Sequence, residues 1–330
     1  EMTVPDYPVT IFYAFKQAES QKEEEQTKEF SLDKERVSTG WETMLKGLLA
    51  SNFEITGTWP MRTELANRSG GLGTNSLASS IVLVCRRRAE DAPSVSRREF
   101  LAALNRELPA ALHCLQRGNI APVDLAQAAI GPGMAVFSRY SAVLESDGSP
   151  MSVHTALALI NRSLDEYLAE QESEYDSDSR WALAWFEQFG HEAGPYGIAE
   201  TLSKAKNTGI ERLTHAGFLE ARGGTVRLLR RDELAKDWDP SITKRVTVWE
   251  ATQYLIRALD EEGEIGAGSL LGKLAEYGET IRDLAYRLYT LCERKGWAQD
   301  ATAYNMLIIA WPQLKNLSDN RTESVQESLL

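Results

Sequence analysis

The sequence has few of the residues that build disulfide frameworks and metal sites. Its three cysteines, Cys85, Cys114 and Cys292, are widely spaced and form no CxxC pair, which excludes a disulfide framework and a zinc knuckle. We expect reduced, mostly buried thiols. The four histidines share no ligand spacing with one another or with the cysteines, so the sequence predicts no metal site.

Long apolar runs are also missing. No run approaches the roughly 18 residues that a membrane span needs, and the N-terminal segment lacks the basic-then-apolar order of a signal peptide. We therefore expect a cytoplasmic protein. A strand pattern begins within ten residues of Glu1, so we also expect the chain to start inside a domain.

Basic residues are outnumbered, with 36 Lys and Arg against 48 Asp and Glu, and the net charge is -12. This balance excludes nucleic-acid binding through the overall electrostatic field of the protein, so any DNA contact must use local basic patches.

The chain has 330 residues with 43% hydrophobic content, which is enough for a sizeable core and two domains.

The first 90 residues show an α/β pattern. Residues 9–15 form a short apolar run that predicts a strand buried on both faces of a parallel sheet. Residues 38–49 have the three-and-four spacing of an amphipathic helix, and residues 53–59 and 79–85 read as strands. A polar, Pro-containing stretch at 91–96 marks the expected domain boundary.

From residue 96 to residue 330 the apolar residues follow helical spacing, so the second domain is predicted to be mainly α. Within it, residues 194–232 resemble a small winged helix: two short helices are followed by two strands that Gly223 and Gly224 would connect as a hairpin. The predicted fold class is therefore α/β followed by mainly α.

This winged-helix-like segment carries a local excess of positive charge. Between Lys204 and Arg245 there are ten Lys or Arg and six Asp or Glu, a balance of +4. The candidate contacts to DNA phosphates are Lys204, Lys206, Arg212, Arg222, Arg227, Arg230 and Arg231. The alternative is that these charges form only the solvated face of a packing module.

Several peptides carry a resemblance to a known family. They are IFYAFKQ, STGWETML, ITGTWPMRTE and GLGTNSLASSIVLVCRRR, and they are followed downstream by GPYGIAETLSKAKNTGIERL and WDPSITKRVTVWEATQYLIRAL. Together they resemble the C-terminal portion of adenine-specific DNA methyltransferases that carry a zinc ribbon and an N-terminal domain of unknown function and are linked to phage defence. The resemblance covers nearly the whole chain.

The resemblance implies a partial Rossmann-like methyltransferase sheet formed by its last three strands. Residues 9–15 would be the fifth strand, and the last strand would be antiparallel to the others. The loop between the last two strands would approach the extruded adenine, because an enzyme that modifies a base takes it out of the stack. The loop candidates are Trp59, Arg62, Glu64, Asn75 and Ser79.

Each loop candidate has a chemical role in this interpretation. Trp59 would stack on the base, Asn75 would form hydrogen bonds with the edge of the base, and Arg62 would bind a phosphate. The alternative assigns Trp59 to packing on the sheet, and Arg62 and Glu64 to a surface ion pair.

Two motifs of the family are missing. No Asp-Pro-Pro-Tyr tetrapeptide occurs, since Asp239-Pro240 is followed by Ser241. The pairs Gly71-Leu-Gly73 and Gly131-Pro-Gly133 lack the strand-before and helix-after context of a donor-binding turn. We therefore assign no catalytic and no cofactor-binding residue, and expect the S-adenosylmethionine site to lie mostly outside this chain.

The sequence leaves two functions open. In the first, the chain is the C-terminal portion of an enzyme that methylates the adenine amino group in double-stranded DNA, and is inactive by itself. In the second, it is a non-catalytic protein that binds DNA or another protein of a defence system.

Overall fold

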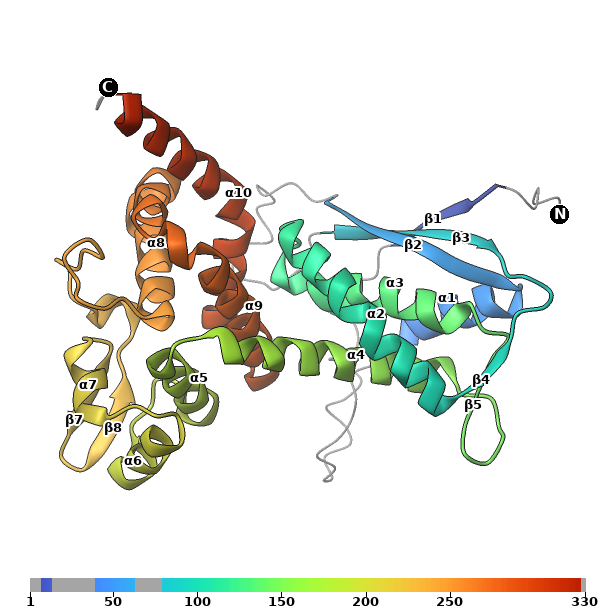
Figure 1. The fold of residues 1–330 in the computed structure, drawn as a ribbon, viewed down its shortest axis with the longest axis horizontal. Coiled ribbons are helices and arrows are strands. Elements are labelled where there is room, and N and C mark those ends of the chain that lie inside the picture. The colour runs from blue at the N-terminus through green and yellow to red at the C-terminus, as the bar shows by residue number, and fades with distance from the viewer. Residues whose placement is uncertain (1–6, 14–38, 63–78, 328–330) are drawn as a thin grey trace. The chain divides into compact units, whose positions relative to one another are not determined.

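A computed structural model describes residues 7–13, 39–62 and 79–327 of the chain (Figure 1). The fold is mixed α/β, with small sheets and a mainly helical C-terminal region. The chain divides into two compact units, residues 1–167 and 168–330, and each is described by itself. None of the described helices is long and apolar enough to cross a membrane.

The first unit contains a three-stranded sheet with the order β1-β3-β2. Its strands are β1 (Val9–Tyr13), β2 (Phe53–Arg62) and β3 (Ser79–Arg87). The last strand, β3, is antiparallel to both neighbours, so β1 and β2 run parallel to each other and are joined through helix α1 (Thr39–Ala50). The helix and the two later strands that the sequence predicts are confirmed within a few residues of their ends.

The predicted burial of the first strand is wrong. Residues of β1 alternate between half-buried and exposed, and the side chain of Phe12 is 68% exposed. Among the described residues β1 pairs only with β3, and helices cover only the face opposite Phe12. Residues 14 and 15 of the predicted strand lie outside the described part of the chain.

The helices of the first unit pack on one face of this sheet (Figure 1). The remaining elements of the unit are β4 (Ser94–Ser96), α2 (Arg97–Arg117), α3 (Pro122–Ser138), β5 (Ala142–Leu144) and α4 (Val153–Glu170), the last of which ends in the second unit. A methyl group added to Gly131 of α3 would overlap Thr58 of β2, and one added to Gly133 would overlap Ile160 of α4. Because α3 lies so close to the sheet, the chain divides after residue 167 and not at 91–96.

The thiols are less uniform than expected. Cys85 and Cys292 are buried and free, as predicted, but Cys114 is free and exposed on α2. The side chains of Ile55, Leu83 and Cys85 form the buried face of the sheet.

The second unit begins with a small mixed segment. Its elements are α5 (Ser177–Phe189), β6 (Gly194–Pro195), α6 (Tyr196–Ala205), α7 (Ile210–His215), β7 (Leu219–Arg222) and β8 (Thr225–Leu228). The three strands have the order β6-β8-β7. The predicted hairpin is confirmed, and both turn residues, Gly223 and Gly224, have the positive φ that favours glycine (60° and 79°).

Three long helices complete the second unit: α8 (Val248–Lys273), α9 (Gly278–Lys295) and α10 (Ala298–Glu327). They pack against one another around Trp249, Tyr286 and Tyr304, which are fully buried. Helix α8 is interrupted at Gly263, where φ is 69°. Short 3-10 helices at Gln171–Glu174, Arg231–Glu233 and Ala275–Tyr277 connect the longer elements.

Candidate functional site

The ends of β2 and β3 bring two of the five loop candidates together. Arg62, the last residue of β2, pairs in register with Ser79, the first residue of β3. Trp59 pairs with Val82, three positions deeper along the same two strands. Glu64 and Asn75 lie in the connection between these strands and fall outside the described residues.

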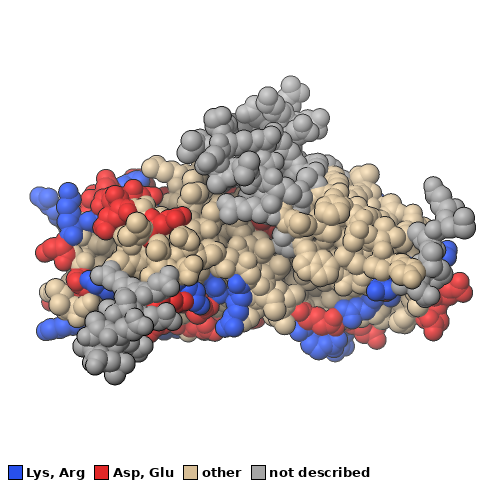
Figure 2. Space-filling model, turned by 90° about the horizontal axis from the view of Figure 1, so that it is seen from above, with Lys and Arg blue, Asp and Glu red and all other residues tan. Residues whose placement is uncertain are grey.

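Trp59 lies on the sheet face that the helices do not cover. Its side chain is 58% exposed, although its ring also lies over Gly57, where an added methyl group would contact ring carbons at 3.0 Å. Phe12, Val82 and Trp59 stand in one row across the three strands. In Figure 2 the surface over this sheet, at the right, consists mostly of uncharged residues.

The cationic candidates of the second unit differ in how closely their side chains pair with carboxylates. Arg227 pairs with Glu220 and Glu233, both at 2.7 Å. Arg231 is largely buried, pairs with Asp300 at 3.0 Å and lies over the ring of Tyr304. We assign these two arginines to holding the unit together, because phosphate binding would require them to leave these partners.

The other candidates are more accessible. Lys204 and Arg230 are exposed and pair with exposed glutamates at 3.1 and 3.5 Å, and such pairs contribute little to stability. Lys206 follows the end of α6. Arg222 is exposed at the tip of the β7–β8 hairpin, and no described side chain forms an ion pair with it. Arg222 is therefore the candidate most free to bind a phosphate.

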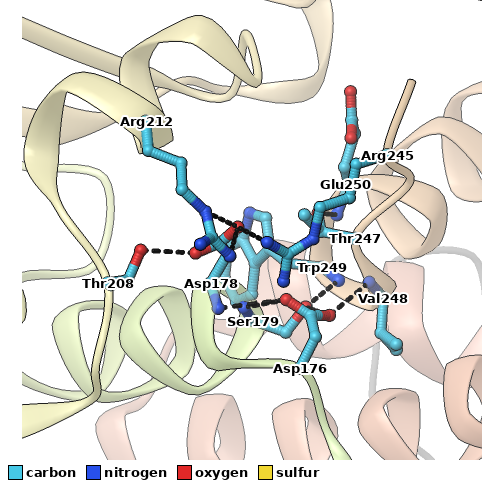
Figure 3. Close-up of polar contacts among 10 residues, drawn as sticks. All are labelled: Asp176, Asp178, Ser179, Thr208, Arg212, Arg245, Thr247, Val248, Trp249 and Glu250. Carbon is cyan, nitrogen blue, oxygen red and sulfur yellow. Dashed lines mark hydrogen bonds and ion pairs between the residues drawn. The ribbon is translucent and has the colours of Figure 1, made fainter. Parts of the chain in front are cut away.

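A polar cluster forms where α5, α7 and the segment before α8 meet (Figure 3). Asp178, only 1% exposed, accepts hydrogen bonds from Thr208 and from Arg212, whose Nη2 lies at 2.9 Å. Arg245 approaches the same carboxylate at 3.7 Å. We call Asp178, Thr208, Arg212 and Arg245 the Asp178 cluster.

The Asp178 cluster holds two guanidinium groups and one carboxylate. The side chains of Arg212 and Arg245 remain 45% and 48% exposed, so both guanidinium groups that share the Asp178 carboxylate also face solvent. Of these two, the sequence singled out only Arg212. Arg245 was missed because it lies outside the winged-helix-like segment and reaches the cluster only through the fold.

Beside this cluster, the carboxylate of Asp176 caps α5 and also binds a backbone N–H at the start of α8, whose own N-cap is Thr247 (Figure 3). Its Oδ1 accepts hydrogen bonds from the backbone N–H groups of Asp178 and Ser179, which begin α5. Its Oδ2 accepts from the backbone N–H of Val248, which begins α8, at 3.0 Å. The hydroxyl of Ser179 accepts from the N–H of Trp249 at 2.8 Å. One carboxylate therefore fixes the start of α5 to the start of α8.

Glu250 lies one turn into α8 and is 2% exposed. Its Oε2 has no hydrogen-bond partner among the described residues. Burial raises the pKa of Glu250 from its ordinary 4.5 to about 7, and the negative charge of Asp176 acts in the same direction. A substantial fraction of this carboxyl is therefore protonated at neutral pH.

The comparisons with known proteins reach only the second unit. Residues 176–329 match a family model described as a domain of unknown function (DUF8807). The matched region begins at Asp176 and covers α5 to α10. No curated protein and no solved structure matches the chain. Within the described ranges, no three His, Cys, Asp or Glu side chains gather closely enough to hold a metal ion.

Proposed function

We propose that this chain is the C-terminal portion of a DNA adenine methyltransferase, in which the β2–β3 end approaches the extruded base and the second unit binds duplex DNA. The observation that carries the proposal is the exposed ring of Trp59 beside the paired ends of β2 and β3. An aromatic ring in such a position offers an extruded adenine a stacking surface.

The strand directions support the first half of this proposal. The family resemblance requires the last strand to be antiparallel to the others, and β3 is antiparallel to β1 and to β2. A β1–α1–β2 connection between parallel strands is the unit from which Rossmann-like sheets are built. The outer edge of β1, which has no partner among the described residues, would be continued by the other strands of the catalytic domain.

The second half rests on the segment from α5 to β8. A helix, a short strand, two helices and a hairpin follow one another, and the first strand pairs with the last. This order of elements resembles a winged helix, in which α7 and the hairpin tip would face the duplex. Arg222 at that tip and the excess charge of the Asp178 cluster would contact phosphates.

S-adenosylmethionine would supply the methyl group, and we assign no residue in the described part of this chain to its binding. Gly131 and Gly133 lie inside α3 and pack against Thr58 and Ile160, so they do not form a donor-binding turn. The chain's own residues would stack and orient the base and bind the DNA backbone.

Replacing Trp59 with alanine tests the base-side role. In the protein that carries this chain, W59A should reduce methyl transfer from labelled S-adenosylmethionine to duplex DNA by about 10- to 100-fold, because stacking on a base contributes about 1–3 kcal/mol. W59F should restore most of the activity. The control M61A removes another exposed apolar side chain of β2 and should retain activity. Equal activities of W59A and M61A would contradict a stacking role.

A charge-removing pair tests the duplex-binding role. R222A combined with R245A should weaken duplex binding at least tenfold at low salt and reduce the slope of log affinity against log salt by about 2, because each phosphate contact contributes about one. The control double variant K295A/K315A removes the same charge from exposed positions on α9 and α10. An unchanged slope in R222A/R245A, measured by fluorescence anisotropy, would rule out this surface.

The alternative function is a non-catalytic protein of a defence system that binds DNA or a partner protein through the same second unit. The Asp178 cluster supports this alternative equally, because binding of DNA or a protein by these side chains does not depend on catalysis at the β1-β3-β2 sheet. Duplex binding without methyl transfer, in the protein that carries the chain, would select this alternative.

A further inference from the structure

A cavity of about 270 Å³ opens in the second unit, between the end of α5, the segment after β8 and the turn from α9 to α10. Three aromatic side chains, Phe186, Phe189 and Trp297, contribute to its wall. Phe186 contacts Trp297 and His191 edge to face, with ring centroids 5.1 and 5.2 Å apart. The cavity is therefore shaped by rings whose positions are fixed by mutual packing.

His191, one of the lining residues, has a defined hydrogen position. Its side chain is 5% exposed, and Nδ1 lies 3.4 Å from the carbonyl oxygen of Leu228. A carbonyl only accepts, so Nδ1 carries the hydrogen. Burial lowers the pKa of His191 below its ordinary 6.5, although Asp300 opposes this shift. At pH 7.5 the ring is neutral and Nε2 is a hydrogen-bond acceptor.

A second acceptor faces this nitrogen. Oδ1 of Asp300 lies 4.0 Å from Nε2 of His191, too far for a hydrogen bond between them. Both atoms accept: no described group donates to Nε2, and Oδ1, which already accepts from Nη2 of Arg231, has a second lone pair free for another donor. A nitrogen with two hydrogens fits between them, because it can lie about 2.9 Å from each.

The surroundings restrict what carries that nitrogen. Arg230 pairs with Glu192 and Arg231 pairs with Asp300, so the charges around the cavity balance and attract neither a cationic nor an anionic ligand. The aromatic wall favours a flat ring. We propose that this cavity binds a neutral planar heterocycle of nucleobase size, with its amino group between Nε2 of His191 and Oδ1 of Asp300 and its ring beside Trp297.

Four free bases test the proposal by calorimetry at pH 7.5. Adenine and cytosine carry an amino group, and hypoxanthine and uracil carry an oxygen at the same ring position. The first pair should bind at least tenfold more tightly, because a carbonyl oxygen would meet two acceptors. Equal affinity for adenine and hypoxanthine, or no binding of any base at millimolar concentration, would overturn the proposal and leave water as the occupant.

Two further measurements locate the binding. H191F keeps a ring against Phe186 but removes the acceptor, so adenine affinity should fall at least tenfold, whereas H113F, at an exposed histidine of α2, should not change it. Binding by the unmodified protein should also be lost as the pH falls through the lowered pKa of His191, because the protonated ring can itself donate to Asp300, among the charges of Glu192, Arg230 and Arg231. Retained affinity in both measurements would place the ligand elsewhere.

Discussion

Replacing Asp176 with alanine should lower the free energy of unfolding of the second unit by about 2–4 kcal/mol. The carboxylate caps α5 through the N–H groups of Asp178 and Ser179, and also accepts from the N–H of Val248 in the first turn of α8, whose N-cap is Thr247. One helix cap contributes about 1 kcal/mol, and the substitution removes this cap together with the hydrogen bonds from Val248 and from the Ser179 hydroxyl. The loss should therefore exceed that of an ordinary cap.

Urea unfolding followed by tryptophan fluorescence measures this loss, because Trp181, Trp185 and Trp249 are fully buried in the second unit. D176N should have an intermediate effect, since it retains an oxygen for one helix but cannot accept bonds at both ends. T247A is the matched control within the same unit, because the Thr247 hydroxyl caps α8 alone and its loss should cost about 1 kcal/mol. Equal losses for D176A and T247A would contradict the joining of two helices by Asp176.

The second large effect is a gain in stability. E250Q should stabilise the protein by about 2 kcal/mol at pH 8, and the difference from the unmodified protein should decrease toward zero near pH 5. Burial raises the pKa of Glu250 in the folded state to about 7, against 4.5 for the ordinary group. The folded state therefore binds more protons than the unfolded state between these values, and stability falls by about 3 kcal/mol as the pH rises through this window.

Glutamine carries no charge, so E250Q should lack this part of the pH dependence. Its buried amide also needs hydrogen-bond partners, which is why the expected gain is smaller than the full ionisation cost. E264Q is the control, because Glu264 lies on the same helix and is exposed. Parallel stability curves for E250Q and the unmodified protein between pH 5 and pH 8 would show that Glu250 is not ionising in a buried environment.

Local patterns predicted the elements whose signals lie within a few residues. The spacing of Trp41 and Leu45 predicted α1, and the glycine pair at 223–224 predicted the hairpin, because helix periodicity and positive φ are properties of the local chain. The capping role of Asp176 was missed, although a carboxylate residue just before an apolar helical pattern is a signal for a helix start. The acidic, serine-rich composition of residues 173–179 is equally typical of a loop, so it does not identify this helix start.

Contacts between distant segments were not predictable in this way. The burial of β1 depends on which strands and helices surround it, and the apolar run of residues 9–15 carries no information on them. Arg212 and Arg245 meet at Asp178 only because α5, α7 and the segment before α8 converge. The sequence predicted Arg227 and Arg231 as phosphate-binding cations. In the fold, Arg227 pairs with Glu220 and Glu233, and Arg231 pairs with Asp300.

The candidate base-side site was predictable only in part. The strand pair and the position of Trp59 near its end followed from alternation along residues 53–59. The exposure of its ring depends on Gly57 and on which sheet face the helices cover. The ring of Trp59 packs over Gly57 and remains more than half exposed, so packing on the strand is compatible with the proposed base stacking.

The most direct test of the proposed function is the methylation of adenine in living cells. The gene that encodes this chain, expressed in a bacterial strain without adenine methyltransferases, should produce methylated adenine that mass spectrometry of hydrolysed genomic DNA detects, and W59A should reduce its amount at least tenfold at equal protein level. Absence of methylated adenine with the unmodified protein, in cells where it accumulates in folded form and binds DNA, would contradict a methyltransferase role.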